Sequence, residues 1–522
     1  MTKRFLMVVA CIAPLAGAAL QEPIQVDGGQ VSGTPAWGWG VRLYRGIPFA
    51  APPVGDLRWR PPQPVVPWQG VLAADRFSSA CMQLPRAQDN IGWRDGLTPT
   101  SEDCLYLNIW TPAKSPDDKL PVMFWIHGGG FRDGSGAETA WHGDNLARQG
   151  VVLITFNYRL NVFGFLAHPG LTAESEHHSS GNYAVLDQIA ALRWVRKNIA
   201  RFGGNPDNVT IFGQSAGGNS VAMQMASPLS KGLFQHAIGQ SGGVGRGAPL
   251  AQAEQSGARF AESLGAHSIA ELRAKPAAIV LGAGAQSGAV VDGWVLPEDP
   301  VSIFVHGRQN DVPLICGSTA DDGPGAGPPL KAADVAAYAK ANFGDLADEY
   351  LKLFPGNSDA QAKKSAHDVR RDRSLVGAKQ WVSLQAATGK SPVYWYLFSH
   401  PAPVPPDSFF DGKTASEVGA YHGADNIYTF NNLHMKDWPW KDVDRKLGDL
   451  VSSIWVQFAR TGNPNGPGLP EWAAFQASHP ALLNIMATPR MEPAPFQTET
   501  EFFEKANARG QQPRRGPAAG GR

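Results

Sequence analysis

The sequence lacks an excess of charge of either sign. Among its 522 residues, 46 lysines and arginines balance 46 aspartates and glutamates. A balanced surface gives no reason to expect nucleic acid or an anionic membrane as a partner. Past the N-terminal segment there is no apolar run long enough to cross a bilayer, and no internal repeat of solenoid length. We therefore expect neither a stable membrane anchor nor a repeat architecture.

Cysteine is scarce, and the four cysteines do not form a metal-binding pattern. The sequence contains no Cys-x-x-Cys motif and no cluster of cysteine and histidine, so it indicates no metal site and no cofactor. Cys316 lies in an apolar run and is expected to be a buried free thiol. Cys81 and Cys104 flank a polar loop, and export of the chain would permit a disulfide. Closing a loop of that size would stabilise the fold by about 3 kcal/mol, mainly through the unfolded state.

The first residues have the three-part pattern of a secretory signal peptide. Lys3 and Arg4 form a short basic region, residues 5–15 form an apolar run, and residues 16–19 are small. The apolar run is too short to span a bilayer. We therefore predict a signal peptide over residues 1–19 and a secreted or periplasmic protein. An N-terminal membrane anchor and a disordered start are the alternatives.

Short apolar runs alternate with helix-like segments along the chain. This order is typical of the α/β class, in which helices flank a mostly parallel sheet. Strands are expected at residues 121–126, 151–158, 209–212, 312–316 and 393–398, and helices at residues 181–202, 216–226 and 446–460. We predict one large domain over residues 20–505 and a disordered tail over residues 506–522, which is rich in glycine, proline and arginine.

One pentapeptide gives the strongest chemical signal. Residues 213–217 read Gly-Gln-Ser-Ala-Gly and fit Gly-x-Ser-x-Gly, the turn that exposes a nucleophilic serine between a strand and a helix. Its glycines leave room for the strand and the helix to approach each other. Residues 239–243 fit the same motif, but the glycines after Ser241 would not begin a helix. Because a plausible helix at residues 216–226 follows Ser215, this serine is the expected nucleophile of an α/β-hydrolase fold.

Three further segments could complete a hydrolytic site. Residues 127–130 read His-Gly-Gly-Gly after an expected strand, where backbone amides can converge on an oxyanion; a plain glycine-rich turn is the alternative, and His127 itself is expected to be structural. Asp321 and Asp322 follow another strand, although an ordinary solvated acidic turn would look the same. His422 lies in a glycine-flanked loop. The order serine, acid, histidine is that of the α/β-hydrolase fold.

Longer motifs make the chain resemble the type-B carboxylesterase family, which includes cholinesterases and bacterial para-nitrobenzyl esterases. The matching segments are YRGIPFAAPP at residues 44–53, EDCLYLNIW at 102–110, HGGGF at 127–131, NYRL at 157–160, and residues 203–217 and 227–242. The resemblance extends over residues 30–475. It implies an α/β-hydrolase fold and the hydrolysis of small-molecule carboxylic esters by a serine nucleophile, without a cofactor.

The resemblance also implies roles for individual residues. It implies that Ser215 is the nucleophile, that His422 is the base and that Asp322 is the orienting acid. The other implied roles are oxyanion donors at Gly129, Gly130 and Ala216, a disulfide between Cys81 and Cys104, structural ion pairs Arg58–Glu102 and Arg159–Asp187, and a second serine near the triad, Ser241.

Two residues depart from the family pattern. The family usually has glutamate at the position of Asp322; aspartate is one methylene shorter, so its loop must lie closer to His422. Asp321 remains a competitor for the role of the acid. The family also often has glutamate where Gln214 stands, so one buried charge is missing here. Since either carboxylate can orient an imidazole, neither change is expected to abolish activity.

The sequence says little about the substrate. Phe131, Trp93, Trp294 and Tyr421 could line a substrate pocket or could equally belong to the core, and no motif indicates choline recognition. Residues 164–169 resemble fumonisin esterases, so a specialist on bulky esters is one alternative; a lipase and a catalytically silent binding relative are others. Fold analogy does not choose among them, and no pattern indicates the oligomeric state.

Overall fold

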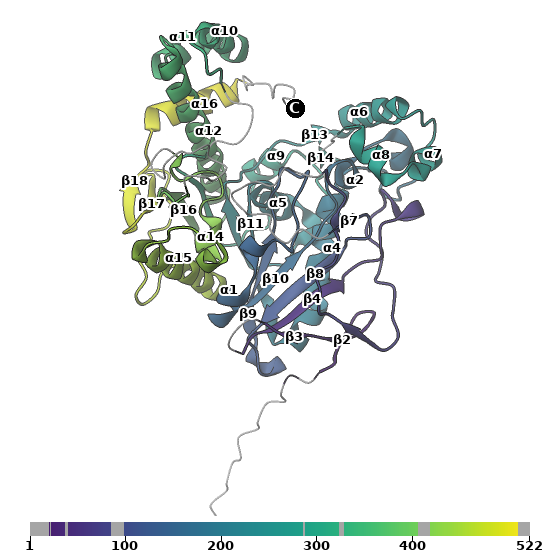
Figure 1. Ribbon diagram of the computed structural model, residues 1–522. Helices are drawn as coiled ribbons and strands as arrows, with labels where there is room; N and C mark the ends of the chain where they lie inside the picture. The colour runs from purple at the N-terminus through teal and green to yellow at the C-terminus, as the bar shows by residue number, and fades with distance from the viewer. Residues whose placement is uncertain are drawn as a thin grey trace, which may run out of the picture.

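The structure, a computed structural model, describes residue 20 and residues 22–36, 40–84, 99–284, 288–322, 328–405 and 418–509. The predicted signal peptide at residues 1–19, Trp93, and residues 510–522 of the predicted tail lie outside these described residues. Figure 1 shows a large sheet through the centre of the molecule, with helices packed against it.

The central sheet has eleven strands among the described residues. In order across the sheet they are β18 (Arg490–Pro493), β17 (Ala481–Ile485), β16 (Val393–Phe398), β15 (Leu314–Thr319), β12 (His236–Gln240), β11 (Gly204–Gln214), β9 (Leu120–Ile126), β10 (Val152–Phe156), β8 (Tyr106–Thr111), β4 (Arg42–Pro48) and β3 (Thr34–Pro35). The strands from β17 to β10 run parallel, whereas β18 at one edge and β8, β4 and β3 at the other pair antiparallel. The predicted α/β class with a mostly parallel sheet is confirmed.

Side chains of the strands alternate between two buried cores, because successive side chains point to opposite faces of a sheet. In β9, Val122, Phe124 and Ile126 pack into one core, while Met123 and Trp125 pack into the other. The first core is completed by α4 (Tyr183–Asn198), α5 (Ala216–Ala226) and α12 (Asp359–Thr388), and the second by α14 (Asn426–Thr429) and α15 (Asp442–Thr461). Because both faces of the sheet are buried here, a central strand such as β9 is apolar along its whole length.

A third apolar cluster lies beyond the sheet, where α10 (Ala332–Phe343), α11 (Ala347–Leu353) and α16 (Gln497–Ala508) pack against α12. Figure 1 shows these helices together at the upper left, above the β16–β18 side of the sheet. Phe343 and Phe502 lie at its centre, with ring centroids 5.3 Å apart. The long helix α12 therefore contacts both this cluster and the sheet.

The remaining helices and strands lie outside the central sheet and the long helices named above. The helices are α1 (Asp144–Arg148), α2 (Asn161–Phe165), α3 (Pro169–Ala173), α6 (Leu250–Ser263), α7 (Ile269–Ala274), α8 (Ala277–Gly282) and α9 (Pro300–Val305). The minor sheets pair β1 (Ile24–Val26), β2 (Gly29–Ser32) and β5 (Val71–Ala73); β13 (Ala248–Pro249) and β14 (Val290–Val291); and β6 (Ala80–Cys81) and β7 (Thr100–Ser101). In Figure 1, α6, α7 and α8 group on the side opposite α10 and α11.

The five predicted strands correspond to β9, β10, β11, β15 and β16, and the predicted helix at 216–226 coincides with α5. The predicted helix at 181–202 is helical over α4 and ends in a 3₁₀ turn, Ile199–Phe202. Residues 506–508 of the predicted tail belong to α16, and Ala506 is buried in the third cluster.

The cysteines and the ion pairs lie where the resemblance implied. Cys81 and Cys104 are joined by a disulfide, and Cys316 is a buried free thiol whose pKa is raised by burial. Arg159 meets Asp187 at 2.7 Å, with both side chains buried, and the Asp187 carboxylate also accepts from the Arg159 backbone amide. The pair therefore ties the segment after β10 to helix α4.

No helix among the described residues has the length and apolar character needed to cross a membrane. In the same part of the chain, no three histidine, cysteine, aspartate or glutamate side chains gather as a metal site.

We expect Asp187→Ala to lower the free energy of unfolding by about 3–5 kcal/mol, because it leaves the buried Arg159 charge without its partner. The control is Asp207→Ala, which removes an exposed carboxylate that pairs with Arg196 and should cost no more than about 1 kcal/mol. Thermal and denaturant unfolding midpoints compare the two variants; equal midpoints would contradict a structural role for the buried pair.

Candidate active site

Four of the predicted site segments follow the carboxyl ends of neighbouring parallel strands. Gly128 follows β9, Ser215 follows β11, and Asp322 follows β15, while His422 lies in the segment after β16. These strands occur in the order β16, β15, β12, β11, β9. Because the carboxyl ends of parallel strands lie along the same side of a sheet, residues that are far apart in sequence meet there.

Ser215 lies in a sharp turn between β11 and α5. Its backbone has φ 59° and ψ −122°, outside the regions that non-glycine residues normally occupy. The turn requires glycine on both sides: a Cβ on Gly217 would lie 2.0 Å from the Ile126 carbonyl oxygen, and one on Gly213 would lie 2.6 Å from Gly217. The strained serine therefore stands at the N-terminus of α5, partly exposed at the carboxyl end of β11.

Ser241 occupies the equivalent place at the end of β12, but no helix follows it. Its hydroxyl oxygen is buried. The glycines around it serve packing, since a Cβ on Gly242 would lie 2.6 Å from the backbone of Gly218 in α5. Ser241 thus lies near the Asp322 carboxyl, whose pKa its hydroxyl helps to lower, and not at the start of a helix.

The glycine loop after β9 lies against the serine turn. A Cβ on Gly128 would be 3.3 Å from the Ser215 Cβ. Gly129 and Gly130 have φ values of 104° and 64°, which glycine alone adopts readily. Among the described residues, the backbone amides of Gly129, Gly130 and Ala216 donate to no protein acceptor. These amides are therefore available to a ligand.

Asp322 and His422 form a short hydrogen bond. Nδ1 of His422 donates to Oδ1 of Asp322 at 2.6 Å, and the hydroxyl of Ser374 in α12 donates to Oδ2 at 2.7 Å. Burial would raise the pKa of Asp322, but the imidazole and the serine hydroxyls beside it hold that pKa below its ordinary value. The carboxylate is therefore ionised, and it fixes the tautomer of His422 with the proton on Nδ1.

His422 is a stronger base here than an ordinary histidine. Burial would lower its pKa, but the charge and hydrogen bond of Asp322, assisted by the charge of Asp425, raise it above the usual value of 6.5. Asp425 lies near the imidazole and accepts hydrogen bonds from Tyr396 at 2.7 Å and from Gln240 at 3.0 Å. Burial raises the pKa of Asp425 itself.

The second ring nitrogen of His422 is occupied by Gln214. The Gln214 amide lies 3.0 Å from His422 Nε2 and donates to it, because the proton of the imidazole is on Nδ1. Among the described residues no hydrogen bond joins the Ser215 hydroxyl to His422. Sequence reasoning noted Gln214 only as a missing charge and did not identify the contacts of Ser374 and Asp425.

Asp321 points away from the imidazole. Its carboxylate accepts from the backbone amide of Ala420 at 2.7 Å and lies 3.1 Å from His367 in α12. Of the two neighbouring aspartates, Asp322 is therefore the one that contacts His422.

The aromatic residues considered for a substrate pocket differ in their surroundings. Phe131 and Tyr421 are buried in the two main cores, and Phe131 packs edge-on to Phe165 with ring centroids 5.1 Å apart. Trp294 is only partly buried and stacks on His177 at 3.7 Å. Trp294 thus remains available to a ligand, whereas most of the surface of the other two is covered.

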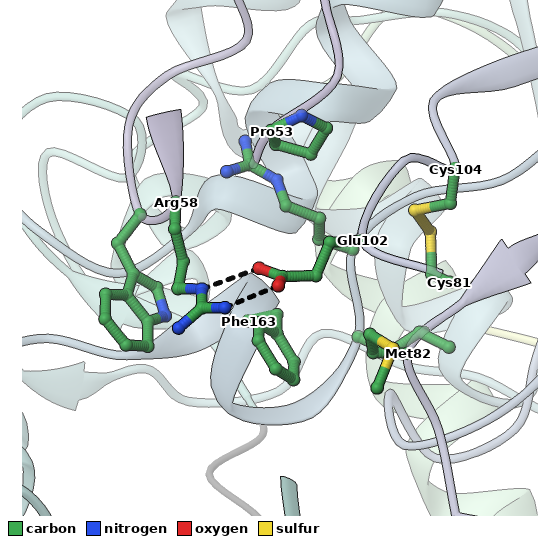
Figure 2. A pocket seen from close by; sticks show the side chains of 10 residues that line it. Pro53, Arg58, Cys81, Met82, Glu102, Cys104 and Phe163 are labelled. Atoms are coloured by element: carbon green, nitrogen blue, oxygen red, sulfur yellow. Dashed lines mark hydrogen bonds and ion pairs between the residues drawn. A yellow bond between two sulfur atoms is a disulfide. The ribbon is translucent and has the colours of Figure 1, made fainter. Parts of the chain in front are cut away.

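A separate pocket lies beside the disulfide and the Arg58–Glu102 ion pair (Figure 2). Its interior has room for about one water molecule. Arg58 binds both carboxylate oxygens of Glu102 and two backbone carbonyls, so its charge is satisfied. The lining residues are Pro53, Arg58, Trp59, Cys81, Met82, Glu102, Cys104, Arg159, Leu160 and Phe163. None belongs to the predicted triad, and the pocket is too small for a substrate.

Comparisons with known proteins agree over nearly the whole chain. A family model described as the carboxylesterase family matches residues 21–503. Fumonisin B1 esterase of Sphingopyxis macrogoltabida is 37% identical over 451 residues, which cover 84% of this chain and 82% of that protein. Para-nitrobenzyl esterase of Bacillus subtilis (strain 168) is 35% identical over 474 residues, covering 86% and 91%.

Solved structures give the same answer for the fold. A PNB esterase structure superposes with a TM-score of 0.79 at 31% identity, covering 92% of this chain and 98% of that one. A carboxylesterase of Geobacillus stearothermophilus superposes with a TM-score of 0.77 at 32% identity, covering 92% and 99%. The mostly parallel sheet with its flanking helices is therefore the α/β-hydrolase fold.

Proposed function

The chain belongs to the carboxylesterase family and is a carboxylic-ester hydrolase, and we propose that it is a secreted serine esterase that works through an acyl-enzyme intermediate. One observation carries the mechanism: the strained Ser215 lies against the glycine loop at Gly128, and its neighbour Gln214 contacts His422, which is bonded to Asp322. This combination supplies a nucleophile, a base with its orienting acid, and donors for an oxyanion.

In the proposed mechanism, Nε2 of His422 takes the proton of Ser215 while the serine oxygen attacks the ester carbonyl carbon. The carbonyl electron pair moves to oxygen, and the resulting oxyanion accepts hydrogen bonds from the amides of Gly129, Gly130 and Ala216. The intermediate collapses, and the leaving alkoxide takes the proton from His422 and departs as the alcohol. Water then loses a proton to His422 and attacks the acyl-serine, and collapse of this second intermediate releases the acid and restores Ser215.

Gln214 gives this cycle a distinct resting state. Its amide donates to the nitrogen that must receive the Ser215 proton, so the serine hydroxyl has to replace this donor for the reaction to begin. The Asp322 bond to the opposite ring nitrogen persists throughout the cycle and stabilises the imidazolium that forms.

The substrates we propose are small carboxylic esters of the para-nitrobenzyl or para-nitrophenyl type, by similarity to para-nitrobenzyl esterase. A second candidate is a bulky ester such as fumonisin B1, which is favoured by the 37% identity to a fumonisin B1 esterase over 84% of the chain. The two differ in size, and relative rates on a short para-nitrophenyl ester and on fumonisin B1 separate them.

We infer export from the signal-like pattern at residues 1–19 and from the Cys81–Cys104 disulfide, since disulfides persist in oxidising compartments. N-terminal sequencing of protein recovered from the periplasm or the medium should give a chain that begins near residue 20. Recovery of the full-length chain from the cytosol alone would contradict export.

Ser215→Ala should reduce ester hydrolysis by at least about 10³-fold, because no other group can form the acyl-enzyme. An organophosphonate should label the native protein on Ser215, as located by mass mapping, with a loss of activity that matches the labelling. The control is Ser241→Ala, which should still be labelled on Ser215.

Label on Ser241 would instead overturn the assignment of the nucleophile. Folded native protein with neither label nor turnover on either class of ester would indicate a catalytically silent binding relative.

The acid limb of the pH–rate profile should report His422. The base must be neutral, and its pKa is raised, so kcat/KM should fall as pH decreases through a midpoint above 6.5. Asp322→Asn removes the charge that stabilises the imidazolium, so the midpoint should move to lower pH while the plateau falls by about 10⁴-fold. A rate that stays flat from mildly acidic to mildly alkaline pH would argue against His422 as the base.

A further inference from the structure

The turn that carries Asp322 is joined to the loop that carries His422 through the preceding residue, Asp321. The Asp321 amide donates to the Ala420 carbonyl at 3.0 Å, and the Asp321 carboxylate accepts from the Ala420 amide at 2.7 Å. The two segments also form an isolated parallel β-bridge between Asp321 and Tyr421. Asp321 therefore joins the turn that holds the acid to the loop that holds the base through both its backbone and its side chain.

The same aspartate is held from behind by helix α12. Nε2 of His367 lies 3.1 Å from Asp321 Oδ1, and Nδ1 of the same ring lies 3.4 Å from Asp368. Two turns further along the helix, Ser374 donates to Asp322. One face of α12 thus contacts both neighbouring aspartates of the acid turn.

Gly419 permits this attachment. It has a φ of 66°, and a Cβ there would lie 2.0 Å from Asp321 Oδ2. Only a residue without a side chain lets the base loop approach the aspartate this closely. Any side chain at position 419 would therefore prevent the contact between this loop and Asp321.

We propose that Asp321 and His367 are positioning residues for ester hydrolysis, which together hold the Asp322 turn and the His422 loop at the separation that the acid–base pair requires. We name these two residues the loop clamp. The proposal rests on the proposed function of Ser215, His422 and Asp322. Its physical reason is the short side chain of Asp322, which reaches the imidazole at 2.6 Å only while the two segments stay close. Displacements of about 1 Å in such a site can cost about 10²-fold in rate.

The loop clamp is an ion pair at neutral pH. The hydrogen bonds of His367 to Asp321 and Asp368 raise the pKa of His367 to about 9. Burial would raise the pKa of Asp321, but the His367 imidazole and Arg371 hold it below its ordinary value. Lys364 and Arg371 both bind Asp368. Asp321 thus comes from the acid turn, and the remaining charges come from α12. As pH rises through about 9, His367 loses its charge and the loop clamp weakens.

The decisive variants keep or remove the cation. His367→Gln should lower kcat by at least about tenfold with little change in KM, because it leaves the substrate-binding groups in place. His367→Arg keeps a charge that does not titrate, so it should retain most of kcat and lack the decline in kcat that we expect of the native enzyme above pH 9. Asp321→Ala should resemble His367→Gln, and Asp321→Asn should be milder because its amide oxygen can still accept from Ala420.

Lys379→Gln is the matched control, since it removes an ion pair between the same helix and Glu504 of α16, away from both catalytic segments. It should leave kcat and the pH profile unchanged. Circular dichroism and the thermal unfolding midpoint establish that each variant is folded.

A second readout does not depend on turnover. The proton in the short His422–Asp322 hydrogen bond should give a far-downfield NMR resonance that is absent from an Asp322→Asn protein. This resonance should broaden or disappear in His367→Gln and Asp321→Ala and persist in Lys379→Gln. If the native protein neither hydrolyses esters nor labels on Ser215, the proposed function fails, while the resonance still tests the loop clamp. An unchanged resonance together with an unchanged kcat in His367→Gln and Asp321→Ala would overturn the loop clamp alone.

Discussion

The proposed chemistry of this protein depends on one close approach, where the start of α5 passes the end of β9. Gly217 is so near the Ile126 carbonyl that a Cβ would lie 2.0 Å from that oxygen. Beside this contact the chain turns sharply at Ser215, which has a positive φ and stands at the helix N-terminus. Gly128 lies against the same serine, so the glycine loop and the proposed nucleophile are neighbours.

Acid and base must then be brought to this serine from another part of the sheet. Asp322 has a shorter side chain than the glutamate usual in the family, and the structure provides for it with a hydroxyl from Ser374 on one carboxylate oxygen and His422 on the other. Gln214 places a neutral amide directly on the other ring nitrogen of the imidazole. The imidazole is therefore held on one nitrogen by a carboxylate and on the other by an uncharged group.

The sequence predicted those parts of the fold and site that depend on local patterns. β9 and β16 are recognisable because both of their faces are buried, so apolar residues are continuous along them. The serine turn is recognisable because its glycines are required sterically. The 30-residue helix α12 was not predicted, because it is largely polar. Its buried residues pack against the sheet at one end and into the third apolar cluster at the other. The contacts of Ser374 and Asp425 arise only in the folded chain, and spacing alone could not show which of two adjacent aspartates faces the histidine.

The order of the strands has a consequence for how the protein is made. Ribosomes deliver the segments in the order β9, β11, β15, β16, so the proposed base, His422, is synthesised after the proposed nucleophile and its acid. Under the proposed mechanism, a nascent chain that ends soon after Asp322 has the serine and the acid but lacks the group that accepts the serine proton. A fragment released by proteolysis or stalled translation before His422 is made would therefore be inert toward esters.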